Sequence, residues 1–230
     1  MLSPAFIGRP GATCGLCQRA HPPFERAVAY GNYDGGLRDL IHLLKYQQVR
    51  PAAEVLGRML AKAVADLEIS LPDGTIPVVP VPLHPRKERQ RGFNQAELIA
   101  RAALKQLACP QRFQLRTGAL VRQRETGSQI GLTRHQRREN LRGAFGVVSP
   151  APIAQRDILL VDDVLTTGTT VSECARVLRR AGAARVWVVT VARTLKTLEA
   201  FAMRDEFWKK ESDEKQDNES EDRQVIVASG

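Results

Sequence analysis

Two adjacent carboxylates and a cluster of hydroxyls follow an apolar run in the stretch DILLVDDVLTTGTTV, residues 157–171. Asp162 and Asp163 end the apolar run, and four threonines surround Gly168. Adjacent carboxylates can accept hydrogen bonds from vicinal hydroxyls, or help to hold Mg²⁺ through their oxygens. A glycine and hydroxyls at a helix start suit a phosphate, because the first N–H groups of a helix lack partners and glycine allows close approach. Together they predict a site for a phosphorylated sugar.

Each half of this stretch also has a simpler interpretation. A solvated acidic turn would explain the carboxylates, although unpaired charges are rarely kept beside so apolar a run. A helix N-cap would explain one threonine, but four exceed that need. The loop is not a Walker A loop, because no G-K-[ST] appears in it.

A basic cluster follows another predicted strand, in the stretch VPVPLHPRKERQRGFNQ, residues 79–95. Cationic side chains here could contact phosphate groups. A solvated basic turn is an equally good interpretation from charge alone. His84 could donate to phosphate, although a loop histidine is more often merely exposed. The basic residues are Arg86, Lys87, Arg89 and Arg91.

The order of apolar runs and helical patterns predicts an α/β domain over residues 27–195, with a mostly parallel open sheet flanked by helices. The runs at 158–161 and 186–192 are apolar apart from Thr190, as in strands buried on both faces. Open sheets of this class bind ligands beyond the carboxyl ends of their strands, where the acid pair and the hydroxyl loop fall. We expect residues 1–26 to form a small, residual Cys-containing segment. We expect residues 196–230 to form a charged tail that is partly helical or disordered.

Helical spacing of apolar residues predicts four helices in this domain. They cover about residues 37–46, 51–67, 94–107 and 169–181. Gly182 falls where a left-handed C-terminal cap would close the last of them. The expected buried stripes are Leu37, Leu40, Ile41 and Leu44; Ala52, Val55, Leu56, Met59, Ala63 and Leu67; Ala96, Ile99, Ala100, Ala103 and Leu107; and Val171, Cys174, Ala175 and Leu178.

The chain carries 34 Lys and Arg against 25 Asp and Glu, a net charge of +9. Residues 196–230 hold six of the basic and ten of the acidic residues, so residues 1–195 hold 28 and 15, a net +13. Such a body suits polyanions, either phosphate-rich small molecules or nucleic acid, although a solvated basic face would look the same. No stretch approaches the roughly 18 apolar residues of a membrane helix, and no secretory pattern opens the chain. We expect a cytoplasmic protein without membrane insertion.

Residues 158–170 resemble the phosphoribosyl pyrophosphate (PRPP) motif of type I phosphoribosyltransferases. The resemblance implies that Asp162 and Asp163 form the catalytic acid pair, which contacts the ribose 2′ and 3′ hydroxyls and takes part, at least indirectly, in holding Mg²⁺. It also implies a 5′-phosphate site made by Thr166, Thr167, Gly168, Thr169 and Thr170. A PRPP site further needs a group that receives the departing pyrophosphate, and the basic cluster of Arg86, Lys87, Arg89 and Arg91 could stabilise the charge that grows on it.

A wider set of motifs resembles the competence protein F (ComF) family, which carries a phosphoribosyltransferase domain. The set runs in order from about residue 27 to 195. It comprises LLKY at 43–46, VPVP at 79–82, RGFNQ at 91–95, the spaced pattern Thr126, Gln129, Leu132, Arg137 and Asn140 followed by GAF, and ARTL at 192–195. The long polar segment 116–142 sits where these enzymes carry a mobile loop that closes over the site, although a plain surface loop or an arginine-rich helix would also explain it.

The resemblance implies a four-cysteine zinc module at the start of the chain, and here the pattern breaks. Cys14 and Cys17 form a single C-x-x-C, which supplies two of the four ligands that zinc needs. Cys174 falls on an apolar helix face and Cys109 lies outside the expected module. We therefore expect a residual half-site and no complete zinc site.

Two functions follow from the resemblance. The first is PRPP binding with Mg²⁺-dependent transfer of ribose 5-phosphate to an unknown acceptor. The second is a non-catalytic accessory role in DNA uptake and utilisation, acting through competence or DNA-processing proteins or single-stranded DNA. Aromatic residues are only 5% of the chain and are not interleaved with the basic cluster, which makes direct DNA binding the weaker form of this alternative.

Overall fold

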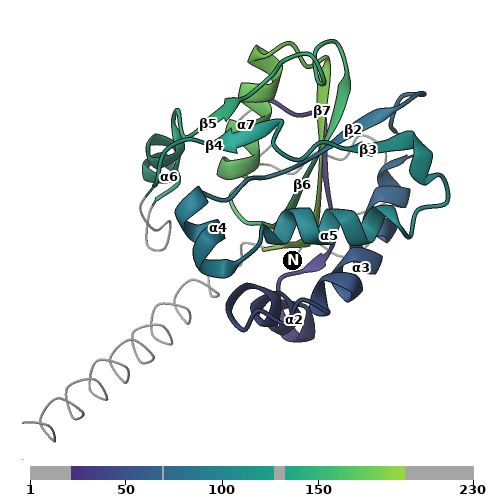
Figure 1. Ribbon diagram of the computed structural model, residues 1–230, viewed down its shortest axis with the longest axis vertical. Helices are drawn as coiled ribbons and strands as arrows, with labels where there is room; N and C mark the ends of the chain where they lie inside the picture. The colour runs from purple at the N-terminus through teal and green to yellow at the C-terminus, as the bar shows by residue number, and fades with distance from the viewer. Residues whose placement is uncertain (1–21, 69, 127–132, 195–230) are drawn as a thin grey trace, which may run out of the picture. The chain divides into compact units, whose positions relative to one another are not determined.

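Five parallel strands form the central sheet, in the order β1-β7-β6-β2-β3 (Figure 1). The structure is a computed structural model and describes residues 22–68, 70–126 and 133–194. The predicted mostly parallel sheet is confirmed. Its strands are β1 (Arg26–Asn32), β2 (Ile76–Pro80), β3 (Phe113–Leu115), β6 (Asp157–Leu165) and β7 (Arg185–Arg193).

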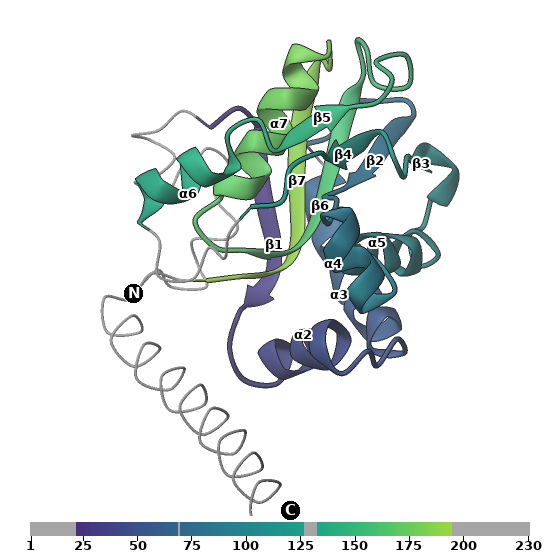
Figure 2. The ribbon, with the colours of Figure 1, turned by 60° about the vertical axis from the view of Figure 1, so that its left-hand side comes forward.

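Helices cover both faces of this sheet (Figure 2). Because side chains alternate along a strand, Leu159 and Val161 of β6 face one core cluster, and Ile158 and Leu160 face the other. The first cluster is completed by α2 (Gly35–Tyr46), α3 (Ala52–Glu68) and α5 (Gln95–Leu104), and the second by α7 (Thr169–Arg180). The predicted helices are therefore all present.

The buried residues of these helices follow the predicted stripes closely. Every predicted position of α5 and α7 is buried, as are Ile41 and Leu44 of α2. In α3, Val55 and Met59 are only partly buried, whereas Gly57 is buried because α3 packs closely against α5. A Cβ atom added at Gly57 would lie 2.4 Å from the Ala102 Cβ atom, so this glycine sets the distance between the two helices.

Strands β2 and β6 lie side by side, yet the chain leaves them in opposite directions. From β2 it passes through α4 (Pro85–Arg91) and α5 to β3, and from β6 it passes through α7 to β7. An open α/β sheet binds its ligands at such a reversal, outside the carboxyl ends of the diverging strands. The crevice expected from topology therefore lies between the ends of β2 and β6.

The polar segment 116–142 is not a plain loop. It contributes β4 (Leu120–Arg122), which pairs antiparallel with β5 (Phe145–Val147) in a separate two-stranded sheet, and it ends in α6 (Arg134–Leu141). A capping box starts α6: Gln136 N–H donates to the Thr133 hydroxyl, and Thr133 N–H donates to the Gln136 side chain. The sequence AFGVV at 144–148 thus contributes a strand outside the parallel sheet. A short 3₁₀ helix, η2 (Pro110–Arg112), precedes β3.

The predicted N-terminal segment 1–26 and tail 196–230 lie wholly or largely outside the described residues, so their assignment stays a prediction. The same holds for Cys14 and Cys17. Within the described part of the chain, no helix has both the length and the apolar character needed to span a bilayer.

Candidate functional site

The acid pair lies inside a strand rather than after it. Strand β6 continues through Asp162 and Asp163 to Leu165, and both carboxylates are buried, with relative exposures of 9% and 4%. Each uses one oxygen to accept the N–H of the next residue: Asp162 accepts from Asp163 and Asp163 from Val164, both at 2.9 Å. The second oxygen of each carboxylate remains for another partner.

Asp163 finds that partner on α2, where the Lys45 ammonium forms an ion pair with its Oδ2 atom. Burial alone would raise the pKa of Asp163, but the Lys45 charge and hydrogen bond outweigh it and hold that pKa below its usual value. Burial likewise works against the charge of Lys45, and Asp163 raises the pKa of Lys45 above its usual value. Both groups are therefore charged over the whole neutral range.

Asp162 has a different environment, toward α7 and β4. Burial, followed by the neighbouring charge of Asp163, raises its pKa well above the usual value. Its own charge acts with burial to raise the pKa of the Cys174 thiol on α7 well above the usual value. Cys174 is accordingly a protonated core cysteine, as predicted from its place on an apolar helix face.

The threonine loop forms the turn between β6 and α7. Gly168 is the residue before the helix and has φ +73°, a left-handed conformation that glycine adopts freely. No side chain caps α7, so its first N–H groups are left for a partner from outside the helix. The Thr167 and Thr169 hydroxyl oxygens are 2.8 Å apart. Thr166 is exposed, and Thr170 is partly buried. This loop offers hydroxyl and N–H donors to an anion.

The basic cluster is a short helix, α4, rather than a loop. Pro85 occupies its first turn, the His84 Nδ1 atom accepts the Arg86 N–H at 3.3 Å, and Gly92 closes it in a left-handed conformation. The proline and glycine at its ends are typical helix boundaries. His84 thus has a capping role in this structure.

The members of the basic cluster differ in their relation to the acid pair. Arg86, Lys87 and Arg89 are exposed, and Arg86 makes only a surface ion pair with Glu125 at 3.5 Å. Arg91 is partly buried, hydrogen bonds to the Gln95 side chain, and has its guanidinium carbon 5.8 Å from the centroid of the Tyr46 ring. Among the contacts described for these four residues, that of Arg91 reaches α2, the helix that also supplies Lys45.

The carboxyl end of α2 is the part of the site that sequence reasoning missed. In the sequence, Lys45 and Tyr46 stand out only as part of the LLKY motif. The Tyr46 ring packs on His42, with centroids 5.1 Å apart, and the His42 Nε2 atom lies 3.1 Å from the Tyr33 hydroxyl. His42 therefore has a structural role between these two tyrosines. A lysine next to the buried stripe of an amphipathic helix was the available signal.

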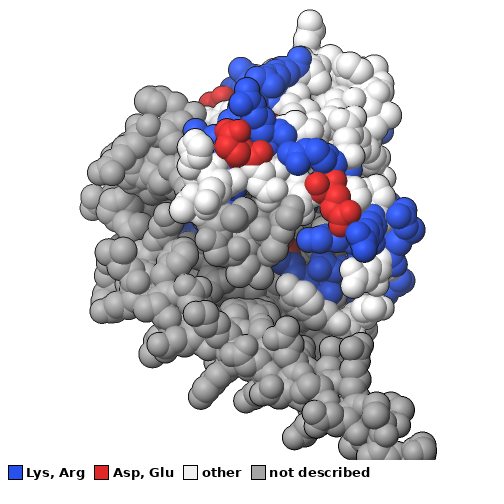
Figure 3. All heavy atoms as spheres, turned by 90° about the vertical axis from the view of Figure 1, so that its left-hand side faces the viewer, with Lys and Arg blue, Asp and Glu red and all other residues white. Residues whose placement is uncertain are grey.

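Aromatic rings and arginines meet in space more often than the sequence indicated. Arg50 lies over Phe93 at 5.3 Å and Arg122 over Phe145 at 5.5 Å, in addition to the Arg91–Tyr46 contact. Tyr46 is the exposed member of this group, with 64% of its surface accessible. On the face of the molecule that carries α4 and α6, Lys and Arg side chains gather with a few acidic ones among them (Figure 3).

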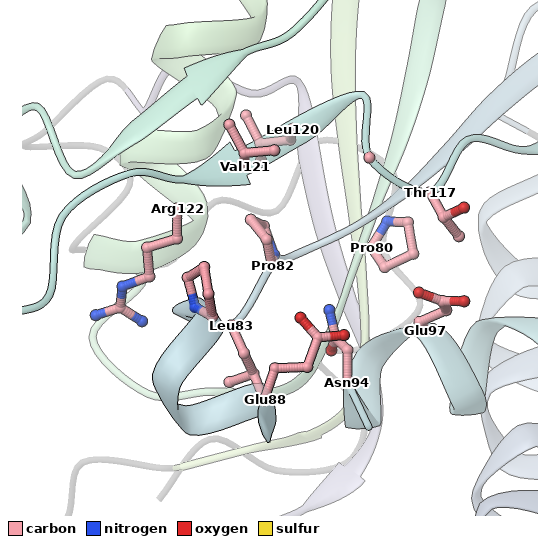
Figure 4. Close-up of a pocket in the computed structure, with 12 residues that line it drawn as sticks. Pro80, Pro82, Leu83, Glu88, Asn94, Glu97, Thr117, Leu120, Val121 and Arg122 are labelled. Atoms are coloured by element: carbon pink, nitrogen blue, oxygen red, sulfur yellow. The ribbon is translucent and has the colours of Figure 1, made fainter. Parts of the chain in front are cut away.

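A cavity of about 250 Å³ lies beside α4, between the start of α5 and β4 (Figure 4). Its walls combine apolar side chains, from Pro82, Leu83 and Leu120 among others, with the carboxylates of Glu88 and Glu97 and the guanidinium of Arg122. Neither residue of the acid pair lines this cavity. Two carboxylates against one guanidinium leave the lining with a net negative charge, which disfavours the phosphates of a sugar phosphate.

The residues present fit magnesium only as an indirectly held ion. Among the described residues, no three His, Cys, Asp or Glu side chains come together as a metal site. Asp163 already pairs with Lys45, so Asp162 is the member of the acid pair for which the described residues show no ion pair. Magnesium commonly uses one or two carboxylates together with substrate oxygens and water, and such a mixed shell is compatible with this donor set.

A parallel α/β sheet with an acid pair and a hydroxyl loop at β6 belongs to the phosphoribosyltransferase class. A family model described as the phosphoribosyl transferase domain matches residues 94–227. The chain is 38% identical over 186 residues to the DNA utilization protein YhgH of Escherichia coli (strain K12), an alignment that covers 79% of this chain and 78% of that protein. It is 34% identical over 185 residues to competence protein F of Haemophilus influenzae, covering 78% of each. The chain belongs to the ComF family, with a type I phosphoribosyltransferase domain.

Solved structures of this class align with the chain as well. A hypoxanthine phosphoribosyltransferase from Staphylococcus aureus aligns with a TM-score of 0.39 at 15% identity, covering 61% of this chain and 64% of that one.

Proposed function

We propose that this protein binds PRPP in the crevice between the carboxyl ends of β2 and β6. Asp162 and Asp163 accept the ribose hydroxyls, and the loop from Thr166 to Thr170 holds the 5′-phosphate. The observation that carries the proposal is a single strand, β6, that presents two buried carboxylates and then leads into an uncapped helix start. Sugar and phosphate subsites adjoin each other in that order.

The reaction proposed for this site is transfer of ribose 5-phosphate to an acceptor of unknown identity. The bond between the ribose C1 atom and the diphosphate breaks, a bond from the acceptor to C1 forms, and pyrophosphate leaves. Magnesium, when bound, would neutralise charge on the diphosphate, with Asp162 contributing indirectly. Arg91 of α4 is the basic residue best placed to receive the leaving group, and Arg86, Lys87 and Arg89 add positive potential from solvent.

Calorimetric titration with PRPP and Mg²⁺ tests the proposal. The unaltered chain is expected to bind, and the double variant Asp162→Asn with Asp163→Asn to lose binding. Asp66→Asn, which changes an exposed carboxylate of α3, is the matched control and should bind like the unaltered chain. No binding by the unaltered chain, or undiminished binding by the double variant, would contradict the proposal.

A second candidate function is DNA handling, which the exposed Tyr46 ring with Arg91 favours. Proteins that hold single strands combine aromatic stacking platforms with cationic side chains that track the phosphates. Tyr46, Arg91 and the exposed residues of α4 supply both kinds of contact within one region. Two relatives are named DNA utilization protein and competence protein F, which agrees with such a role.

A salt titration of oligonucleotide binding tests this second candidate. Affinity should fall steeply with salt, and Tyr46→Ala should weaken binding about tenfold, since one stacked base contributes roughly 1–3 kcal/mol. Tyr30→Ala, at a less exposed tyrosine of β1, is the control. Weak binding at low salt, or equal effects of the two substitutions, would leave PRPP chemistry as the explanation.

A further inference from the structure

Lys45 is held at the site by a rigid support. It lies in the last turn of α2, whose Ile41 and Leu44 are completely buried in the core beneath the sheet. Its side chain is 18% exposed, so it reaches the surface of the site while its stem is covered. The position of this ammonium is therefore fixed by the fold rather than by a flexible surface segment.

The Lys45 ammonium has more N–H donors than its ion pair with Asp163 uses. Lysine carries three N–H donors, and in the described part of the chain its one anionic partner is Asp163 Oδ2. The other oxygen of Asp163 accepts the Val164 N–H at 2.9 Å. Each carboxylate oxygen can accept two hydrogen bonds, so Asp163 Oδ1 can accept a sugar hydroxyl in addition to the Val164 N–H, while the buried Oδ2 atom faces Lys45. A sugar hydroxyl on this carboxylate therefore lies near Lys45.

The same turn of α2 contacts the basic helix. Arg91 of α4 lies over the ring of Tyr46, the neighbour of Lys45, and the Arg50 guanidinium donates to the Gly92 carbonyl at 3.3 Å. Both views of the fold place α2 and α4 at the same end of the sheet (Figures 1 and 2). Lys45 thus contacts the carboxylate that would hold the sugar, and its neighbour Tyr46 contacts the helix that would receive the diphosphate.

The chemistry of PRPP links these two subsites through adjacent atoms. Its diphosphate is attached to C1, and the nearest ribose hydroxyl is on C2. We infer that Lys45 binds the diphosphate of PRPP while it stays paired with Asp163, so that one ammonium joins recognition of the sugar to recognition of the leaving group. This inference rests on the proposed function and adds a ligand-binding residue to that site.

The test compares ligands with and without the diphosphate. PRPP and ribose 5-phosphate are titrated, each with Mg²⁺, into the unaltered chain and into Lys45→Met, Lys45→Arg, Asp163→Asn and the double variant Lys45→Met with Asp163→Asn. A direct contact to the diphosphate predicts that adding Lys45→Met to Asp163→Asn weakens PRPP about tenfold further and leaves ribose 5-phosphate within about twofold. Lys45→Arg, which keeps the charge, should retain most of the PRPP affinity.

The double variant removes both buried charges together, so it keeps the test valid if Lys45→Met alone does not fold. If Lys45 only orients Asp163, the double variant should bind PRPP as Asp163→Asn does, and that result would overturn the inference. Equal losses of PRPP and ribose 5-phosphate on adding Lys45→Met would overturn it too. Failure of the unaltered chain to bind either ligand would instead overturn the proposed function, and the inference with it.

Discussion

Lys45 of α2 and Asp163 of β6 form a buried ion pair that joins the carboxyl end of a helix to the acid pair of the central sheet. The pair joins α2, the first helix that the structure describes, to β6 in the centre of the sheet. Both side chains are largely buried. It neutralises one of two adjacent buried carboxylates. The Lys45–Asp163 ion pair therefore affects both the stability of β6 and the net charge that a ligand meets at the acid pair.

Breaking this pair from one side should be strongly destabilising. Lys45→Met leaves Asp163 buried without a cation, and such a loss reduces the free energy of unfolding by about 3 kcal/mol or more. Adding Asp163→Asn should restore most of that loss, because the uncompensated charge is gone. Urea denaturation of the two single variants and the double variant measures this coupling. Additive effects of the two substitutions would contradict it.

The pair should also leave a signature in the pH dependence of stability. The pKa of Asp163 is lowered by folding, so its contribution is present above the unfolded-state pKa and is lost as pH falls through the folded value. The pKa of Lys45 is raised, so its contribution is present below the unfolded-state pKa and is lost as pH rises through the folded value. On an Asp162→Asn background, which removes the raised pKa of Asp162 from the comparison, the change in unfolding free energy on adding Lys45→Met with Asp163→Asn should therefore be flat between about pH 5 and 9. A steady slope across that window would contradict the pairing.

Asp162 is expected to weaken the fold that it serves. Burial and the neighbouring Asp163 raise its pKa, so folding is penalised wherever the unfolded carboxyl is ionised. Asp162→Asn should raise the free energy of unfolding at pH 7 by about 1 kcal/mol, as is common when a strained functional site is relieved. The gain should vanish below about pH 3, where the carboxyl is protonated in both states. Asp66→Asn is the exposed control and should change stability by less than about 0.5 kcal/mol.

The close packing at Gly57 gives a prediction about the helices that support the site, α3 and α5, rather than about the site itself. An alanine there would bring its Cβ atom within 2.4 Å of Ala102 Cβ and 2.9 Å of backbone atoms, which forces α3 and α5 apart. Gly57→Ala should reduce the melting temperature, with a loss of about 1–3 kcal/mol from overpacking. Gly36→Ala is a matched helical control with nothing within 4 Å, and it should leave stability unchanged or slightly raised. Equal effects at both positions would contradict the close packing of α3 on α5.

Local sequence signals were sufficient for most of the fold. The strands β6 and β7 were visible as uninterrupted apolar runs, and the stripes of α5 and α7 as helical spacing. The acid pair and the threonine loop could be located because they adjoin each other in one strand–loop–helix unit. Helix α4 was also within reach, since Pro85 and Gly92 mark its two ends, but its charge made it look like a loop.

Contacts between distant segments could not be predicted. Nothing near Asp163 in the sequence indicates that Lys45 pairs with it, and nothing near Arg91 indicates that Tyr46 lies beneath it. The interleaving of aromatic and basic residues looked absent along the chain and is present in space, because it arises where α2 meets α4. Pairings of this kind depend on how helices pack around the sheet, which a single sequence does not specify.

The most direct measurement is a crystal structure of the protein with PRPP and Mg²⁺. The account predicts the 5′-phosphate on the loop from Thr166 to Thr170, the ribose hydroxyls on Asp162 and Asp163, and the diphosphate between Lys45 and Arg91. A ligand in the cavity beside Pro82 and Glu88, or a 5′-phosphate on α4 with the threonine loop empty, would contradict it.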